Sequence, residues 1–309
     1  MLVVYQFIES YLFVPANRLD KLESVRYTLP NAIILDWEDA IAPEDKARVR
    51  AETLAQLPQL AESTDRIWVR INAYGSEYYA DDIAALLKLN EMVAIQGVVL
   101  PKTETQTAIE ATAEQTGKPV LAQLESAAAW LALPELAKAK GLFALTFGCL
   151  DLARELGIKL NSEAGKALMN RLRGDLLLHS KANGLPAPIE SVYPDFQDKD
   201  GFIAHLRNCG ELGFGGALCI HPRQVSIVQY FNTPNDEEWA FAKKVVKHYQ
   251  ATQEAVFEID GKMVDKPVIE AALELHERIV EVPFLDLPFN AHEKPRQPNS
   301  ESSSDSKPE

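Results

Sequence analysis

Eight short runs of apolar, β-prone residues recur along this chain, and stretches with helical periodicity separate them. The runs are continuous rather than alternating, which is typical of strands that are covered on both faces, as in parallel sheets. Strands that alternate with helices in this way predict an α/β fold, a (β/α)8 TIM barrel, with a doubly wound sheet as the main rival. The expected strands are residues 11–15, 32–36, 66–71, 97–101, 119–125, 142–148, 189–193 and 216–220, and the expected helices include residues 45–57, 80–89, 105–115 and 165–183.

The chain of 309 residues is expected to divide into a barrel and a C-terminal extension. Residues 1–235 hold the eight β units and form one barrel domain. Residues 236–288 are expected to form a helical segment that packs on the barrel or on a neighbouring subunit, with a helix over 237–257 and a turn followed by a helix over 259–281. Residues 289–309 are polar, rich in Ser and Pro and without periodicity, which is typical of a disordered tail.

Charge and cysteine usage narrow the class of protein. The formal net charge is −14, with a pI near 5.0, which argues against nucleic acid or an anionic membrane surface as a partner. The three cysteines, Cys149, Cys209 and Cys219, have no metal-type spacing and indicate reduced thiols. No apolar run is long enough to cross a bilayer, and the first residues do not read as a signal peptide. We therefore expect a soluble, cytoplasmic protein.

Polar side chains follow the expected strands at the points where these end. A barrel gathers the carboxyl ends of its strands around one mouth, so residues that are distant in sequence would converge there. These residues are Asp36, Glu38 and Asp39 after the second strand, Arg70 and Asn72 at the third, Lys102 at the fourth, Glu125 at the fifth, Asp151 after the sixth and His221 after the eighth.

Two of these acids predict a metal site. Glu125 and Asp151 would come from adjacent strands, and two carboxylates with open positions suit a hard divalent ion such as Mg²⁺. Arg70 beside that ion could fork onto a substrate carboxylate by two parallel hydrogen bonds. Asp36 and Glu38 could orient water molecules around the ion as a second shell.

Each of these residues also has a purely structural interpretation. Glu125 precedes a helix and could favour its dipole, and Asp151 could be a helix N-cap. Arg70 could pair with a structural carboxylate, and Lys102 could be solvated. For His221, which precedes a proline, a hydrogen bond to the backbone is the favoured interpretation. Taken together, however, one metal-centred anion site explains the residues with fewer assumptions.

Longer motifs point to a family. The segments LFVPANR, IILDWEDAI, WVRIN, GVVLPK, TFGCLDLARELG, GFGGALCIHPRQ and DGKMVDKPVIEAA follow one another between about Tyr11 and about Ala272. In this order they resemble the citrate lyase beta-subunit-like proteins of the HpcH/HpaI aldolase superfamily, which are related to malyl-CoA and citramalyl-CoA lyases. The resemblance covers nearly the whole folded part of the chain.

The resemblance implies a (β/α)8 barrel that forms trimers or larger homo-oligomers. It implies Mg²⁺ at Glu125 and Asp151, and an Arg70 that binds the carboxylate of a 2-oxo acid, assisted by main-chain amides of residues 148–152. Asp265, in the segment MVDKP, would act as acid or base from a neighbouring subunit, whereas the residues alone favour a helix N-cap there. The resulting hypothesis names Arg70, Asp265 and Glu38 as catalytic residues and Arg70, Gly148, Leu150, Asp151, Arg18 and Lys102 as substrate-binding residues.

The chain departs from the family pattern at several positions. Ala16 and Ala129 replace usual glycines, Trp37 replaces a leucine, and Ala217 stands where a lysine is usual. Trp37 and Ala129 are expected to narrow the substrate pocket, and the lost lysine removes a positive charge that could help to bind an anion.

These features predict a Mg²⁺-dependent lyase. It would cleave, or form, a 3-hydroxyacyl thioester, giving a 2-oxo acid and acetyl-CoA or a related thioester, and the sequence leaves open whether CoA or an acyl-carrier protein bears the acyl group. Two alternatives stay open. One is a CoA-independent aldolase of the same superfamily that cleaves a 4-hydroxy-2-oxo acid, and the other is a non-catalytic barrel that serves in assembly or ligand binding.

Overall fold

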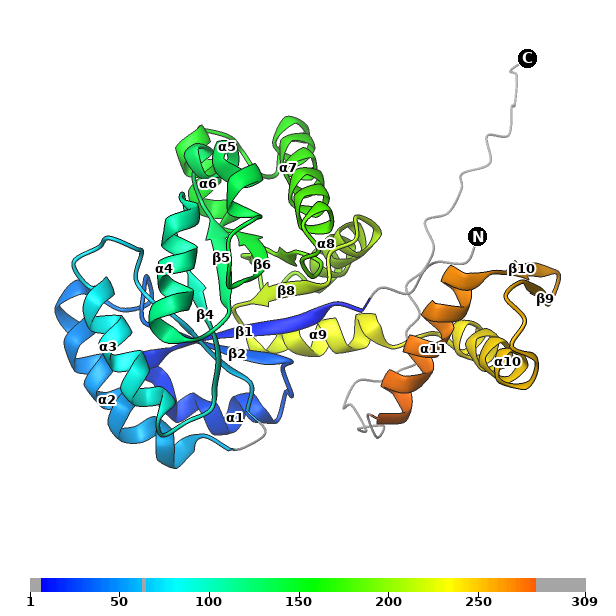
Figure 1. The fold of residues 1–309 in the computed structure, drawn as a ribbon, viewed down its shortest axis with the longest axis horizontal. Coiled ribbons are helices and arrows are strands. Elements are labelled where there is room, and N and C mark those ends of the chain that lie inside the picture. Colours follow the sequence, from blue (N-terminus) through cyan, green and yellow to red (C-terminus); the bar gives the residue numbers. More distant parts are fainter. Residues whose placement is uncertain (1–6, 63–64, 282–309) are drawn as a thin grey trace, which may run out of the picture. The chain divides into compact units, whose positions relative to one another are not determined.

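A computed structural model describes residues 7–62 and 65–281 of the chain. The chain divides into two compact units, of which the first ends at Glu237 and the second begins at Glu238 (Figure 1). Each unit is considered by itself. The tail expected over residues 289–309 lies outside the described residues.

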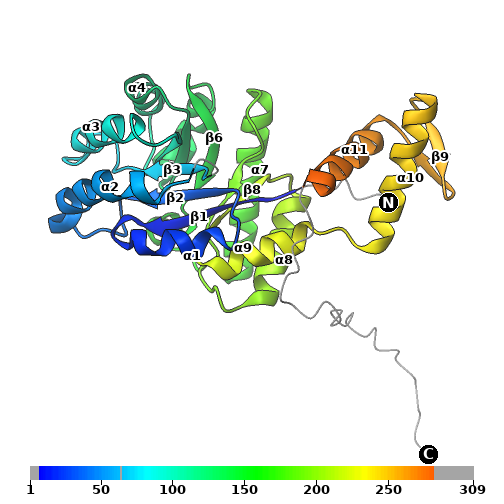
Figure 2. The ribbon, with the colours of Figure 1, turned by 90° about the horizontal axis from the view of Figure 1, so that it is seen from below.

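The first unit is a ring of eight parallel strands with helices on its outside (Figures 1 and 2). Hydrogen-bonded pairing runs in the order β6-β5-β4-β3-β2-β1-β8-β7, and β6 and β7 lie next to each other at the ends of this order, which makes the barrel nearly closed. The predicted TIM barrel is therefore confirmed. Its strands are β1 (Glu9–Pro15), β2 (Ala32–Asp36), β3 (Ile67–Arg70), β4 (Ile95–Leu100), β5 (Val120–Leu124), β6 (Leu142–Phe147), β7 (Ile189–Glu190) and β8 (Gly216–Cys219).

Each strand is followed by helical structure, and the four helices expected in this unit are confirmed to within three residues at their ends. The helices of the first unit are η1 (Ala16–Lys21), α1 (Leu22–Arg26), η2 (Pro43–Asp45), α2 (Lys46–Leu60), α3 (Tyr79–Asn90), α4 (Gln106–Thr116), α5 (Ala127–Leu136), α6 (Cys149–Leu156), α7 (Glu163–Ala182), α8 (Lys199–Glu211) and α9 (Pro222–Asn232).

Apolar side chains form two layers in this unit, one inside the barrel and one between the strands and the helices. There are two layers because successive residues of a strand point to opposite faces. In β2, Ile34 packs inside the barrel, while Ile33 and Leu35 pack against the helices outside. The same alternation carries Asp36 to the inner side at the end of β2. In β5 it places Leu121 in the inner layer, and Gln123 and Glu125 follow at the same parity. The strand pattern therefore aims polar side chains at the mouth of the barrel.

The second unit holds α10 (Asp236–Thr252), a hairpin of β9 (Phe257–Ile259) and β10 (Lys262–Val264), and α11 (Lys266–Glu281). The helix predicted over 237–257 is wrong at its end, because α10 stops at Thr252 and Gln253 takes a positive φ of 56°. The expected turn is a β-hairpin whose corner is Asp260-Gly261, both with positive φ. Asp-Gly is a strong signal for such a two-residue hairpin.

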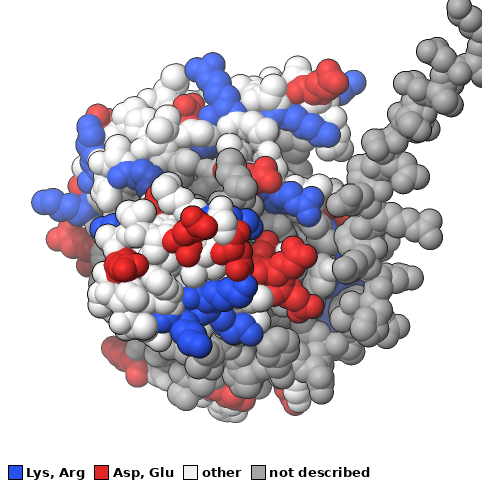
Figure 3. Space-filling view, turned by 90° about the vertical axis from the view of Figure 1, so that its right-hand side faces the viewer, with Lys and Arg blue, Asp and Glu red and all other residues white. Residues whose placement is uncertain are grey.

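Charges of both signs lie side by side on the surface that Figure 3 draws. In the second unit Lys244 pairs with Asp260 at 2.7 Å. Within the described ranges, no helix is both long enough and apolar enough to span a membrane.

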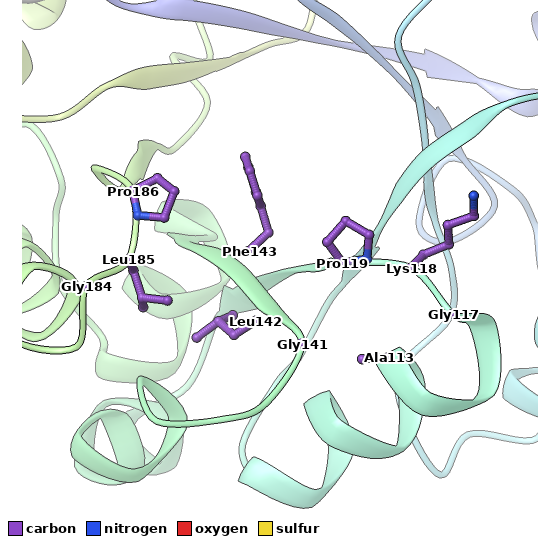
Figure 4. A pocket seen from close by; sticks show the side chains of 10 residues that line it. All are labelled: Ala113, Gly117, Lys118, Pro119, Gly141, Leu142, Phe143, Gly184, Leu185 and Pro186. Carbon is purple, nitrogen blue, oxygen red and sulfur yellow. The ribbon is translucent and has the colours of Figure 1, made fainter.

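A cavity of about 640 Å³ opens at the amino-terminal end of the barrel (Figure 4). Lys118 and Pro119 reach it from the start of β5, Phe143 from the start of β6, and Leu185 and Pro186 from the segment before β7. Its lining is mostly apolar and carries no acid. In TIM barrels chemistry belongs to the opposite, carboxyl end of the strands, so this cavity is not the candidate site.

Candidate metal and substrate site

Glu125 lies directly after β5 with 5% of its surface exposed. Its Oε1 accepts a hydrogen bond of 2.6 Å from Gln123 Nε2, and its Oε2 has no hydrogen-bond partner in the described part of the chain. Ser126 caps α5 through its own hydroxyl, which accepts from the amide of Ala129. The helix therefore does not need Glu125 in its first turn, and a buried carboxylate oxygen is left free for a ligand.

Asp151 lies in the first turn of α6, the helix that follows β6, and β6 is the strand next to β5 in the sheet. The N-cap of this helix is Gly148, so the interpretation of Asp151 as an N-cap is wrong. Gly148 packs directly on Glu125, since a Cβ built on it would lie 2.8 Å from Glu125 Cγ. The side chain of Asp151 is 35% exposed and pairs with Arg154 at 3.0 Å. The two acids thus leave neighbouring strands on either side of one glycine.

Asp36 and Arg70 form a buried, two-pronged ion pair at the ends of β2 and β3. Arg70 Nε and Nη2 donate to the two oxygens of Asp36 at 2.7 and 2.6 Å. Arg70 Nη1 lies 3.4 Å from Glu38 Oε2, and the guanidinium lies over the ring of Phe13 at 4.7 Å. Arg70 therefore pairs with a protein carboxylate, which was the structural alternative considered for it. Of its three polar contacts, the one made by Nη1 is the longest.

Lys102 bridges Glu38 and Asp39 at the mouth. Its Nζ contacts Glu38 Oε1 closely and lies 3.2 Å from Asp39 Oδ1. The interpretation of Lys102 as merely solvated is wrong. Its backbone has a φ of 51°, a left-handed conformation that is unfavourable for a side chain with a Cβ and that clusters at functional sites.

The net charge of the side chains around Glu125 favours the binding of a cation. Burial, together with the carboxylates of Glu38 and Asp151 and against the lowering effect of Lys102 and Arg70, raises the pKa of Glu125 to about 7. With Asp36 and Asp39 included, five carboxylates stand against the three basic side chains of Arg70, Lys102 and Arg154, so the group carries an excess of two negative charges once Glu125 is ionised. A divalent cation would neutralise this excess, and oxygen ligands suit Mg²⁺.

The affinity for Mg²⁺ is expected to fall as the pH falls below about 7. A metal binds the ionised carboxylate, and at lower pH it must displace the proton that burial favours on Glu125. The expected slope is about tenfold per pH unit below 7, levelling off above pH 8. Calorimetric titration with Mg²⁺ between pH 5.5 and 8.5 measures this, and a flat profile would mean that Glu125 is not a ligand.

Gly148→Ala is expected to weaken Mg²⁺ binding by at least about tenfold, because the new methyl group displaces the Glu125 carboxylate. Gly174→Ala is the matched control, since Gly174 lies in α7 with open space where its Cβ would be. The control is expected to keep its affinity, as measured by Mg²⁺ titration. Equal affinities of the two variants would contradict the packing of Gly148 on a ligand.

The other predicted residues lie in different surroundings. Arg18 is exposed and forks onto Asp20 at 3.0 Å. Leu150 is 49% exposed in the first turn of α6. The structural interpretation of His221 is confirmed, because its Nδ1 accepts from the amide of Arg223 and caps α9. Asp265 belongs to the second unit, directly before α11.

The side chains of the four residues named as departures from the family pattern do not face the mouth. Trp37 is buried in the outer layer, and its Nε1 donates to Thr53 Oγ1 at 3.2 Å. Ala16, Ala129 and Ala217 are buried in the same layer. The expectation that Trp37 and Ala129 narrow the pocket is therefore wrong, because both side chains are fully buried in this outer apolar layer.

Two buried residues support the mouth without having been assigned a role from the sequence. Lys46 donates to the carbonyls of Trp37 and Glu38 at 3.1 and 2.8 Å and so fixes the turn after β2. Gln123 holds Glu125, as described above. Lys46 lies in the charged segment EDKAR of residues 44–48, which follows no strand directly, and a glutamine within an apolar strand gives no spacing signal.

A separate cluster lies away from Glu125 in sequence: Glu190, His205 and Cys209. In the described ranges it is the only group of three side chains whose ligand atoms lie close enough together to share a metal ion. Arg173 already donates to both oxygens of Glu190 at 2.9 and 2.8 Å. A guanidinium on the carboxylate repels a cation, so this cluster is a buried ion pair rather than a metal site.

The fold and the site together define a TIM barrel with an acidic, cation-attracting centre at the carboxyl ends of its strands. The chain belongs to the HpcH/HpaI aldolase/citrate lyase family, which it matches over residues 9–222.

Individual relatives share most of their length with this chain. It is 30% identical over 261 residues to a (3S)-malyl-CoA thioesterase of Cereibacter sphaeroides, which covers 83% of this chain and 89% of the relative. A solved structure of CitE from Mycobacterium tuberculosis, in complex with magnesium, acetoacetate and coenzyme A, superposes with a TM-score of 0.72 at 27% identity, covering 90% of this chain and all of the other. A citrate lyase beta subunit from the same organism, complexed with oxaloacetate and magnesium, has a TM-score of 0.64 at 27% identity, with coverages of 75% and 100%.

Proposed function

We propose that this chain is a Mg²⁺-dependent carbon–carbon lyase that cleaves a 3-hydroxyacyl-CoA thioester into a 2-oxo acid and acetyl-CoA or a related thioester. One observation carries the proposal. The buried, unpartnered Oε2 of Glu125 lies in a group of carboxylates with an excess of negative charge, next to the Arg70 guanidinium. The related structures that hold magnesium together with a 2-oxo acid, or with coenzyme A, support it.

The residues at the mouth fit a Mg²⁺ ion. Glu125 Oε2 and the partly exposed carboxylate of Asp151 would hold it. Glu38, whose charge acts on Glu125, and Asp36, which shares Arg70 with Glu38, would orient its water molecules. When bound, Mg²⁺ supplies a Lewis acid that stabilises negative charge on the substrate oxygens.

Arg70 and Lys102 bind and orient the substrate. Arg70 keeps its fork on Asp36 and offers Nη1, whose contact with Glu38 is long, to the carboxylate that becomes part of the 2-oxo acid. Glu38 holds Lys102 and Arg70 in place, one with each oxygen, so we assign it to positioning these cations. This fixes the angle between the carboxylate and the bond that breaks.

Further contacts to the substrate are proposed at the start of α6 and on η1. The amides of Leu150 and Asp151 lie in the first turn of the helix, where N–H groups favour an anion, whereas the amides of Gly148 and Cys149 already donate to Leu124 O and Ser191 Oγ. Arg18 is exposed and basic, and suits a phosphate of CoA if it exchanges its partner Asp20. An acyl-carrier protein would present the same kind of thioester.

Asp265 is proposed to supply the proton. The substrate hydroxyl loses its proton to water as its oxygen becomes the ketone oxygen of the oxo acid. The carbon–carbon bond then breaks and its electron pair passes to the α-carbon of the thioester, which Asp265 would protonate, or from which it would remove the proton in the direction of synthesis. We propose that it reaches the site from the second unit of a neighbouring subunit in a trimer or hexamer, so that the C-terminal segment of residues 236–288 completes the site.

Asp265→Asn is expected to lower turnover by about 10²–10⁴-fold, the usual contribution of a positioned acid or base, with unchanged Mg²⁺ affinity. Asp260→Asn, in the neighbouring hairpin, is the control and is expected to stay active. Mixed oligomers of Asp265→Asn and Glu125→Gln subunits are expected to regain part of the activity, because some sites then combine both intact residues. No recovery in mixed oligomers would contradict the origin of Asp265 in a neighbouring subunit.

A product assay tests the proposed reaction. Malyl-, citramalyl-, citryl- and hydroxymethylglutaryl-CoA are incubated with the protein, with Mg²⁺ or with EDTA, and the oxo acid and the acyl-CoA product are quantified. We expect equal amounts of both with at least one substrate, and only with Mg²⁺. An oxo acid product from substrates without any thioester would favour the CoA-independent aldolase instead, and binding of Mg²⁺ and oxo acid without turnover would favour the non-catalytic barrel.

A second candidate function is thioester hydrolysis, because a relative that is 30% identical is a malyl-CoA thioesterase. The same assay separates the two reactions. Hydrolysis releases free CoA thiol and the intact hydroxy acid, whereas cleavage of the carbon–carbon bond releases an oxo acid and no thiol.

A further inference from the structure

Gln123 is a buried amide on the strand β5, whose other residues are all apolar. It is 5% exposed and lies two residues after Leu121 on the inner side of β5. Its Oε1 has no hydrogen-bond partner in the described ranges, and the same holds for the hydroxyl of Thr146, its register partner on β6. Burying an amide that is only half satisfied costs stability, so a glutamine here needs a reason other than packing.

The one described side-chain bond of this amide points to Glu125. Gln123 Nε2 donates to Glu125 Oε1 at 2.6 Å. A carboxylate oxygen can only accept, so the amide must present its nitrogen to Glu125. On the same side, Gly148 packs so closely that a Cβ there would lie 2.9 Å from Oε1. Oε1 is thus occupied from two directions.

The two oxygens of the Glu125 carboxylate are therefore not equivalent. With Oε1 held by Gln123 and covered by Gly148, Oε2 is the oxygen that is buried and unpartnered. On the basis of the proposed function, which makes Glu125 a metal ligand, we infer that Gln123 is a positioning residue that fixes the Glu125 carboxylate so that Oε2 alone faces the cation. Partners behind a metal ligand commonly set its orientation in this way.

Gln123→Met tests the inference, because methionine has a similar length and flexibility but cannot donate a hydrogen bond. The expected result is a Mg²⁺ dissociation constant raised by about 10–100-fold, the usual effect of losing such a partner. The measurements are calorimetric titration with Mg²⁺ and the electron paramagnetic resonance spectrum of bound Mn²⁺, which reports a change in ligand geometry. Thermal unfolding without metal is expected to show an equal or higher midpoint, which separates positioning from a merely structural role.

Thr146→Val is the matched control. Thr146 is equally buried and pairs in register with Gln123, but it makes no hydrogen bond to Glu125. This variant is expected to keep the Mg²⁺ affinity of the unaltered protein within about twofold.

Glu125→Gln shows whether a failure concerns only the role of Gln123 or also the assignment of Glu125 as a metal ligand. If it abolishes Mg²⁺ binding while Gln123→Met binds Mg²⁺ as tightly as the unaltered protein, the positioning role is overturned and the proposed metal ligand stands. If Glu125→Gln itself binds Mg²⁺ normally, both the metal assignment and the role of Gln123 are overturned.

Discussion

Glu125→Gln is expected to lose Mg²⁺ binding and to lower kcat/KM by about 10²–10³-fold or more, since it removes the buried charge that attracts the cation. The same variant is expected to be more stable than the unaltered protein when Mg²⁺ is absent. Burial raises the pKa of Glu125 to about 7 in the folded protein, from an ordinary value of 4.5. Its ionised form therefore destabilises the fold progressively as the pH rises from about 4.5 to 7, and fully above 7.

The expected gain at pH 8 is on the order of 1–3 kcal/mol in the free energy of unfolding, measured by urea denaturation in EDTA. Glu135→Gln is the control, because Glu135 is exposed in α5 and pairs with Lys138. It is expected to change neither Mg²⁺ affinity nor stability. A Glu125→Gln protein that is less stable than the unaltered one without metal would contradict the picture of an uncompensated buried charge.

Arg70→Met is expected to lower the free energy of unfolding more than any other substitution proposed here, and also to lower the affinity for the substrate. It leaves the buried carboxylate of Asp36 without its two-pronged partner and removes a contact of Glu38. Breaking a buried ion pair in this way costs about 3–5 kcal/mol of unfolding free energy. The variant is also expected to lose the binding of a 2-oxo acid such as oxaloacetate, measured by calorimetry in the presence of Mg²⁺.

Arg26→Met separates the two effects. Arg26 forks onto Asp65, which lies before β3 at the opposite end of the barrel. Its replacement is expected to lower the unfolding free energy as well, while the affinity for the oxo acid stays unchanged. Unaltered oxo-acid affinity in Arg70→Met would mean that Arg70 is only a structural partner of Asp36.

The barrel could be predicted from the sequence because the strands are continuous apolar runs, and the site could be predicted because several of these runs end in a charged residue. In β2, for example, AIILD closes on Asp36, and in β5 the run closes on Glu125. Alternation along the strands then carries these ends to one mouth. The convergence of Asp36, Arg70 and Glu125 follows from this rule alone.

The partners of these side chains could not be predicted in the same way. The sequence assigned Arg70 to a substrate carboxylate, but it cannot show that the guanidinium first satisfies Asp36. The direction in which Trp37 points depends on its parity after β2, which the comparison of motifs does not give. The turn at Asp260-Gly261 was predicted, but its hairpin was missed for a different reason, because the expected helix was extended past Gln253 to residue 257, where β9 begins.

The most direct test of the metal site is a crystal grown with Mn²⁺ and oxaloacetate, measured at a wavelength where manganese scatters anomalously. We predict an anomalous peak between Glu125 Oε2 and Asp151, with the oxo acid beside Arg70. A peak at Glu190, His205 and Cys209, or a manganese ion that touches neither Glu125 nor Asp151, would contradict this account.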